Sequence, residues 1–172
     1  NLDLGLETRY SDFAKSQQWK DLYKKFGHTR KENLAGFLKE KADEDSWFSI
    51  EKCLAEYAKK KIEQQDFSHV IEDQLFFDLL EEHLDTYLTL VSIDSQVKDH
   101  LSTKLLGAMH KKKVFDKIYT FNYIPHDALY QYLGCNYEND VLHVHQQLGL
   151  GIVLGVAEND IADDRYSFLR KV

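Results

Sequence analysis

The sequence has little of what membrane, secreted or extended proteins need. It holds one proline and eight glycines among 172 residues, which argues against long linkers and low-complexity segments. Its two cysteines are too few to indicate a disulfide-stabilised scaffold, so we expect reduced thiols. No apolar run approaches the roughly 20 residues that a membrane-spanning helix requires, and no signal peptide opens the chain. These absences predict a cytoplasmic globular protein.

Positive charge is also scarce. The chain has 22 Lys and Arg against 29 Asp and Glu, a formal net charge of −7. A nucleic-acid-binding surface needs an excess of basic residues, so nucleic acid is a disfavoured partner. The short clusters Lys59–Lys61 and Lys111–Lys113 each adjoin acidic residues, and we expect them to be solvated helix ends. The first residue is Asn1 rather than Met, so we expect sequence upstream of it.

The first two-thirds of the chain has the apolar periodicity of helices. Serines precede two of the periodic segments and are candidate N-caps, and a glycine follows the first segment as a candidate helix end. The predicted helices are Ser11–Phe26 ended by Gly27, a short one around Leu34–Leu38, one opened by Ser46 with Trp47, Ile50, Leu54 and Tyr57 on one stripe, and Phe67–His110 with a break near Ser92–Ser95.

After Lys113 the pattern changes to β-branched and aromatic runs. These predict a Rossmann-like α/β fold: a parallel sheet with a large helical insertion. We expect a single domain over 1–172, with its helical part at about 8–112 and its Rossmann-like part at about 113–172 plus the N-terminal segment. The predicted elements are a buried strand Val114–Tyr123, a helix Asp127–Leu133, strands Val141–His145 and Gly151–Val156, and a last helix starting at Asp163 and Asp164.

Ligands of open parallel sheets bind beyond the carboxyl ends of the strands. That rule selects three strand ends as a candidate nucleotide crevice: Thr120–Tyr123, His143–His145, and Gly155 with the following Glu158. Other roles stay open, because Asn122 could stabilise a turn and Glu158 could lie in a solvated loop. Since His143 and His145 are two apart on a strand, they face the same side and could be half-buried histidines or metal ligands.

Five segments along the chain carry a more specific pattern. They are NLDLGLETRYSDF at the start, SWFSIEKCLAEY from Ser46, TFNY from Thr120, VLHVH from Val141 and IVLGVAENDIADDRYSFLRK from Ile152. In this order they resemble the AbiH family of bacterial phage-defence (abortive infection) proteins. The first segment resembles the stretch after that family's glycine loop, with Asn1 where the family usually has an aspartate. Gln146 stands where the family has a glycine after the second histidine.

The AbiH family is in turn similar to sirtuin-type NAD-binding domains. The resemblance therefore implies NAD as the ligand, with Asn122 holding the ribose or the attacking water and His145 acting as the general base. Glu158 would steady the positive charge that develops when the glycosidic bond breaks. The residues implied to bind the nucleotide are Asn1, Gly5, Thr120, Asn122, Tyr123, His143, Gly155 and Glu158.

Three functions stay open at this point. The first is a defence enzyme that hydrolyses NAD. The second is a non-catalytic nucleotide-binding switch or scaffold, favoured by Ile124 at the position where sirtuins carry an aspartate. It would act as a homo-oligomer or with a partner protein of the defence system. The third is a metal-dependent nuclease using acidic residues such as Glu158, Asp160 and Asp163.

Overall fold

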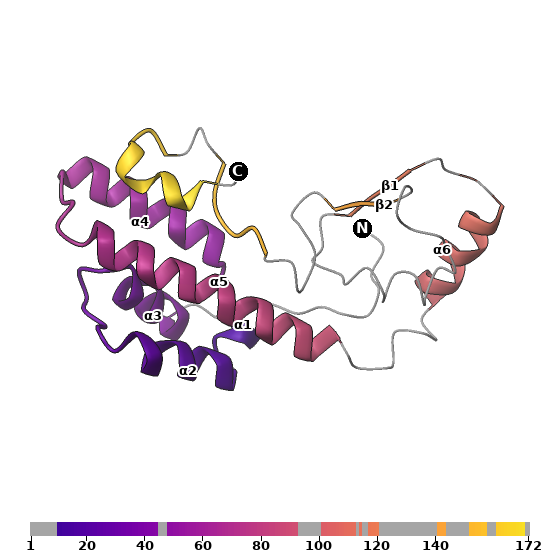
Figure 1. Ribbon diagram of the computed structural model, residues 1–172, viewed down its shortest axis with the longest axis horizontal. Helices are drawn as coiled ribbons and strands as arrows, with labels where there is room; N and C mark the ends of the chain where they lie inside the picture. The colour runs from indigo at the N-terminus through magenta and orange to yellow at the C-terminus, as the bar shows by residue number, and fades with distance from the viewer. Residues whose placement is uncertain are drawn as a thin grey trace. The chain divides into compact units, whose positions relative to one another are not determined.

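The computed structural model divides the chain into two compact units (Figure 1). The helical unit comprises Arg9–Leu84 and Val153–Val172, and the strand unit comprises Asn1–Thr8 and Asp85–Ile152. The structure describes residues 10–44, 48–92, 101–112, 114, 117–120, 141–143, 152–157 and 161–170.

The helical unit begins with two helices where one was predicted. Helix α1 (Tyr10–Phe13) is separated by a turn from α2 (Gln17–Phe26). The predicted N-cap Ser11 therefore lies inside α1, and Ser16 caps α2 instead, its hydroxyl accepting a hydrogen bond from the backbone N–H of Trp19 at 3.2 Å. The predicted helix end at Gly27 is confirmed: this residue has φ of 72°, a conformation that glycine adopts without strain.

Three further α-helices follow in the described part of this unit: α3 (Leu34–Glu44), α4 (Ile50–Gln64) and α5 (Val70–Ser92), whose last turns continue into the strand unit. Helix α4 is capped by Ser49, one turn later than predicted, and Ser46 lies outside the described residues. Helix α5 ends at Ser92, where the predicted break begins. No described helix is both long and apolar enough to cross a membrane.

Aromatic side chains dominate the core of the helical unit. The rings of Phe13 and Trp19 meet edge to face with centroids 5.4 Å apart, and those of Phe26 and Phe76 with centroids 5.1 Å apart. Such perpendicular arrangements place the positive edge of one ring against the negative face of another. In α5, the apolar side chains of Leu80 and Leu84 are buried, but those of Ile71 and Leu75 are exposed.

The C-terminal segment packs on α4 and α5 and belongs to the same core (Figure 1). Its last helix starts at the predicted place, because Asp163 caps the 3-10 helix η3 (Asp164–Leu169). Within η3, Tyr166 is fully buried, and its ring centroid lies 6.1 Å from that of Tyr57 on α4. The C-terminal segment of the helical unit is therefore joined to α4 by an aromatic contact.

The described part of the strand unit contains α6 (Leu101–Lys111) and two short strands. Strands β1 (Ile118–Thr120) and β2 (Val141–His143) pair in parallel. The register sets Ile118 opposite Val141 and Thr120 opposite His143, so both carboxyl ends lie at the same edge of the pair.

The predicted Rossmann-like sheet with a helical insertion is wrong. About 70% of the described residues are helical, and the described sheet has only two three-residue strands. The predicted strand Gly151–Val156 makes a single isolated bridge, from Val156 to Arg170. Leu154 and Val156 of this segment are instead buried within the helical unit, which shows that the helices form a core of their own.

The strand predicted over Val114–Tyr123 is also shorter and less buried than expected. Only Ile118–Thr120 is described as a strand, while Val114 and Tyr119 have 57% and 62% of their surface exposed. The β-branched and aromatic composition that suggested burial reflects strand propensity here, since such residues also fit a pleated surface that is only half-buried. The predicted helix Asp127–Leu133 lies outside the described residues.

Candidate functional site

The candidate site predicted from the sequence falls partly on the described strand pair. Thr120 and His143 end β1 and β2 and lie opposite each other. The chain leads from this edge to Asn122, two residues after Thr120, and to His145, two residues after His143. Asn122, Tyr123 and His145 lie outside the described residues. The structure therefore describes only the two strand ends, Thr120 and His143, from which the site would be built.

The other predicted binding residues are not gathered at this edge by the described structure. Gly155 belongs to the helical unit, where it is buried with φ of 147°, a conformation that favours glycine. The backbone N–H of the preceding Leu154 donates a hydrogen bond of 3.0 Å to the Glu81 carboxylate. Asn1, Gly5 and Glu158 lie outside the described residues, and a role for any of them in nucleotide binding stays a prediction.

A second group of polar residues, which sequence patterns did not indicate, lies inside the helical unit. The carboxylate of Asp73 on α5 is 1% exposed and accepts hydrogen bonds from three elements. The donors are the backbone N–H of Leu34 at 2.7 Å, the hydroxyl of Tyr57 at 2.7 Å and the hydroxyl of Tyr166 at 3.4 Å. A buried carboxylate is tolerated when its oxygens are satisfied in this way. Asp73 therefore ties α3, α4 and η3 to α5.

Burial controls the protonation of this cluster. It raises the pKa of the Asp73 carboxyl, against the hydrogen bonds from Leu34 and Tyr57, which stabilise the charged form. Burial also raises the pKa of the Tyr57 and Tyr166 hydroxyls, and the neighbouring Asp73 charge adds to both increases. Both tyrosines consequently stay protonated and remain donors to Asp73.

One lysine of the cluster predicted to be solvated is buried. Lys61 is 4% exposed, and its ammonium pairs with the carboxylate of Asp66 just beyond the end of α4. The hydrogen bond from Lys61, followed by that from the Ser68 hydroxyl, lowers the pKa of Asp66. Lys59 and Lys60 are exposed as expected. The prediction was wrong for Lys61 because its side chain packs against the buried Tyr57. The Lys61 ammonium lies over the Tyr57 ring, 5.6 Å from its centroid.

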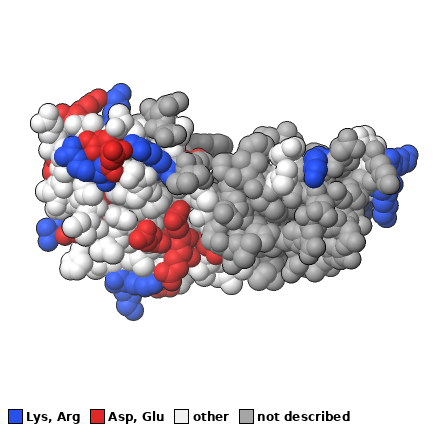
Figure 2. Space-filling view, turned by 45° about the horizontal axis from the view of Figure 1, so that its top comes forward, with Lys and Arg blue, Asp and Glu red and all other residues white. Residues whose placement is uncertain are grey.

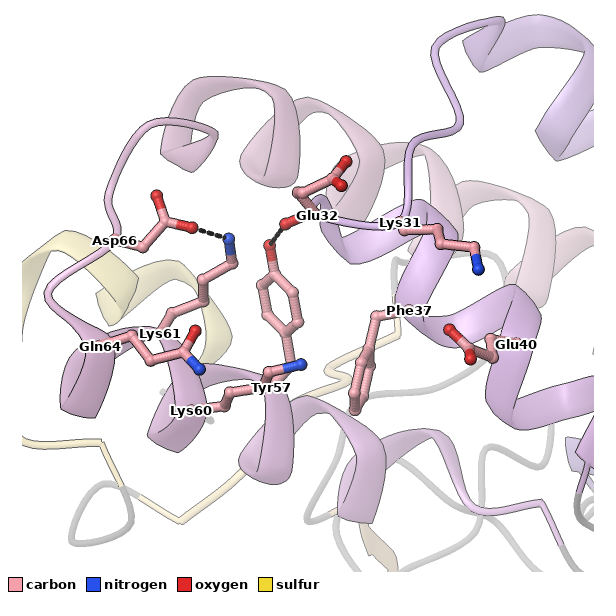
Figure 3. Close-up of a pocket in the computed structure, with 9 residues that line it drawn as sticks. All are labelled: Lys31, Glu32, Phe37, Glu40, Tyr57, Lys60, Lys61, Gln64 and Asp66. Carbon is pink, nitrogen blue, oxygen red and sulfur yellow. Dashed lines mark hydrogen bonds and ion pairs between the residues drawn. The ribbon is translucent and has the colours of Figure 1, made fainter.

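A hollow of about 310 Å³ opens beside Tyr57 and Lys61 (Figure 3). We call it the polar hollow. The rings of Phe37 and Tyr57 lie between two groups of charged side chains, one on the side of α4 and one on the side of α3 (Figure 3). The lining residues are Lys31, Glu32, Phe37, Glu40, Tyr57, Lys60, Lys61, Gln64 and Asp66.

Charges of both signs also mix over the described surface seen in Figure 2, where basic side chains lie beside acidic ones. A surface that attracts a nucleic-acid backbone would instead gather basic residues on one face. Among the described residues, no group of three or more His, Cys, Asp or Glu side chains is placed to hold a metal ion.

The comparisons with known proteins add no relative: no family model, no curated protein and no solved structure matches this chain.

Sequence patterns missed both the buried Asp73 carboxylate and the polar hollow, for one physical reason. Periodicity separates apolar from polar positions, so it places Asp73 and Lys61 on solvated faces by default. One local signal was available. Asp73 stands three, four and seven residues before Phe76, Phe77 and Leu80, so helical spacing puts this carboxylate on an apolar face of α5. Only the tertiary structure shows that its partners are Leu34, Tyr57 and Tyr166.

Proposed function

We propose that the protein acts in defence against phage inside the cell and binds NAD at the carboxyl edge of the β1–β2 pair, where it hydrolyses the nucleotide. The observation that carries this proposal is the parallel register that sets Thr120 opposite His143. Parallel pairing brings two chain segments to one edge, and both continue into residues of the AbiH-like pattern, TFNY and VLHVH. The role in defence rests on that resemblance.

The chemistry assigned to this edge needs few groups. His145, as a neutral imidazole, would take a proton from water while the water oxygen attacks the ribose carbon that carries nicotinamide. The carbon–nitrogen bond would break, with its electron pair leaving on nicotinamide. The Asn122 amide would position the water or the ribose. Imidazole suits the role of base because its ordinary pKa lies near neutral pH.

NAD consumption by the purified protein tests the proposal directly. The wild type should release nicotinamide, and the variants His145→Ala and Asn122→Ala should lose at least about 100-fold in rate, the scale of removing a general base. His28→Ala is the matched control, because this exposed histidine lies in the helical unit. Full activity in His145→Ala would contradict the role of the base.

A non-catalytic nucleotide switch is the second candidate, and one observation favours it. Ile124 stands where sirtuins carry an aspartate, so a carboxylate expected near the reacting carbon is absent from that position. Equilibrium binding of NAD separates the two functions. Saturable binding that His145→Ala leaves intact, with no nicotinamide released by the wild type, would favour the switch. Absence of both binding and turnover would contradict the assignment of NAD to this edge.

Protection of cells tests the role in defence. Phage should form fewer plaques on bacteria that express the chain than on bacteria that express the variant with both His145→Ala and Asn122→Ala. Equal plating efficiency against a broad phage panel would contradict the role in defence while leaving the NAD chemistry to be judged by the purified protein.

A further inference from the structure

The polar hollow of the helical unit has charged groups that its own structure does not use. Among the described residues, the side chains of Lys31, Glu32 and Glu40 make no ion pair or hydrogen bond, and all three are exposed. Lys60 is exposed as well, and its ammonium lies 5.9 Å from the centroid of the Phe37 ring. These groups are independent of the strand edge, which belongs to the other unit.

The base of the polar hollow is held firmly in place. The Tyr57 hydroxyl is fixed by Asp73 at 2.7 Å and by the backbone carbonyl of Glu32 at 3.1 Å. Lys61 is buried and paired with Asp66, so neither of these charges is available to a ligand. A rigid base whose polar groups already have partners is the kind of support that keeps a small binding site from rearranging when a ligand enters.

The remaining charges divide into two poles (Figure 3). On the side of α4, Lys60 contributes one positive charge beside the Gln64 amide. On the side of α3, the Glu40 carboxylate lies beside the Phe37 ring and contributes the negative charge, while the side chains of Glu32 and Lys31 lie apart from it (Figure 3). The apolar ring of Phe37 lies between the poles. The polar hollow therefore has a dipole across a partly apolar middle.

We propose that the polar hollow binds a small zwitterion the size of a dipeptide. Its carboxylate would lie against Lys60 and Gln64, and its ammonium against Glu40. A nucleotide fits this arrangement less well, because its phosphates would also face Glu40 at like charge. A volume of about 310 Å³ is at the small end of the range for ligand sites, which suits a dipeptide.

The contacts are exposed, so the affinity should be modest, with a dissociation constant on the order of 1 mM. The test is a titration of the full chain with glycyl-L-phenylalanine, in which two-dimensional NMR measures the change in each backbone amide chemical shift. We expect saturable shifts at the backbone of α4 and of the segment from Lys31 to Glu40. N-acetyl-glycyl-phenylalanine, which lacks the ammonium, and glycyl-phenylalaninamide, which lacks the carboxylate, should each bind about threefold to fivefold more weakly.

Two variants assign the poles. Lys60→Met should remove the advantage of the dipeptide over its amide, and Glu40→Gln should remove its advantage over the acetylated form. Lys59→Met is the matched control: Lys59 is an exposed neighbour on α4 that does not line the polar hollow, and its loss should change neither ratio. Absence of saturable shifts, equal binding of all three ligands, or tighter binding of AMP at the same residues would overturn the proposal.

Discussion

The two units use their apolar residues in different ways. In the helical unit, large side chains such as Phe13, Phe76 and Tyr166 have none of their surface exposed. In the described part of the strand unit, Tyr119 and Leu142 lie opposite each other on β1 and β2 with 62% and 46% of their surface exposed. The difference teaches that strand-forming residues do not by themselves define a core, because burial needs a second surface to pack against.

Removing a core ring should have the largest effect and tests the contrast between the units. Phe76→Ala should lower the free energy of unfolding by about 3–5 kcal/mol, since it leaves a cavity beside Tyr23 and Phe26. Tyr119→Ala should cost less than about 1 kcal/mol because the side chain is exposed. Urea unfolding followed by circular dichroism measures both. Similar losses for the two variants would break the comparison.

Two glycines sharpen the account of the helical unit. A Cβ at Gly36 would lie 1.8 Å from the backbone carbonyl oxygen of Arg30, so Gly36→Ala should force a backbone shift and cost about 3 kcal/mol. A Cβ at Gly27 would meet nothing within 4 Å, and only its positive φ opposes alanine, at about 1–2 kcal/mol. Thermal unfolding ranks the two, and a larger loss for Gly27→Ala would contradict the steric argument.

The buried carboxylate of Asp73 should make stability depend on pH. Burial raises its pKa in the folded protein above the unfolded value of about 3.9. Its contribution is therefore greatest below pH of about 4 and falls as the pH rises through the folded pKa. Relative to Asp73→Asn, which does not titrate, the wild type should lose stability over that window.

Urea unfolding at several pH values between about 4 and 7 measures the difference. Asp78→Asn is the matched control, since Asp78 is an exposed carboxylate on the same helix. A wild type that gains stability over Asp73→Asn with rising pH would mean that the hydrogen bonds from Leu34 and Tyr57 outweigh burial.

The smallest predicted effect is a gain. Gln65 ends α4 with φ of 53°, a conformation that costs a residue with a Cβ more than it costs glycine. Gln65→Gly should raise the free energy of unfolding by up to about 1 kcal/mol, while Gln65→Ala should not. Thermal unfolding of the two variants side by side decides the point, and an equal change in both would refute the role of φ.

Local signals predicted part of the helical unit well. The Gly27 helix end, the helix around Leu34 and the start of the last helix at Asp163 depend on residues adjacent in sequence, and all three are confirmed. The N-caps were less accurate. Ser16 and Ser49 cap their helices, although Ser11 and Ser46 precede the same apolar patterns and are equally good caps by chemistry.

The short apolar run from Ile152 to Val156 shows why the sheet was overestimated. Such a run fits a buried strand and an extended segment packed on helices equally well. The structure chooses the second, with Ile152, Leu154 and Val156 all buried and Leu154 held by Glu81. Of the predicted site, the structure describes the strand ends Thr120 and His143, while the proposed roles of Asn122 and His145 remain predictions.

The sequence by itself determined which segments are helical, where several of them end, and that charge of both signs would be spread over the chain, because these properties depend on neighbouring residues and composition. Only the tertiary structure decided that the C-terminal segment completes the helical core, that Asp73 and Lys61 are buried, and that Lys60 and Glu40 line one hollow. Each of these results brings together residues far apart in sequence, and no local pattern contains that information.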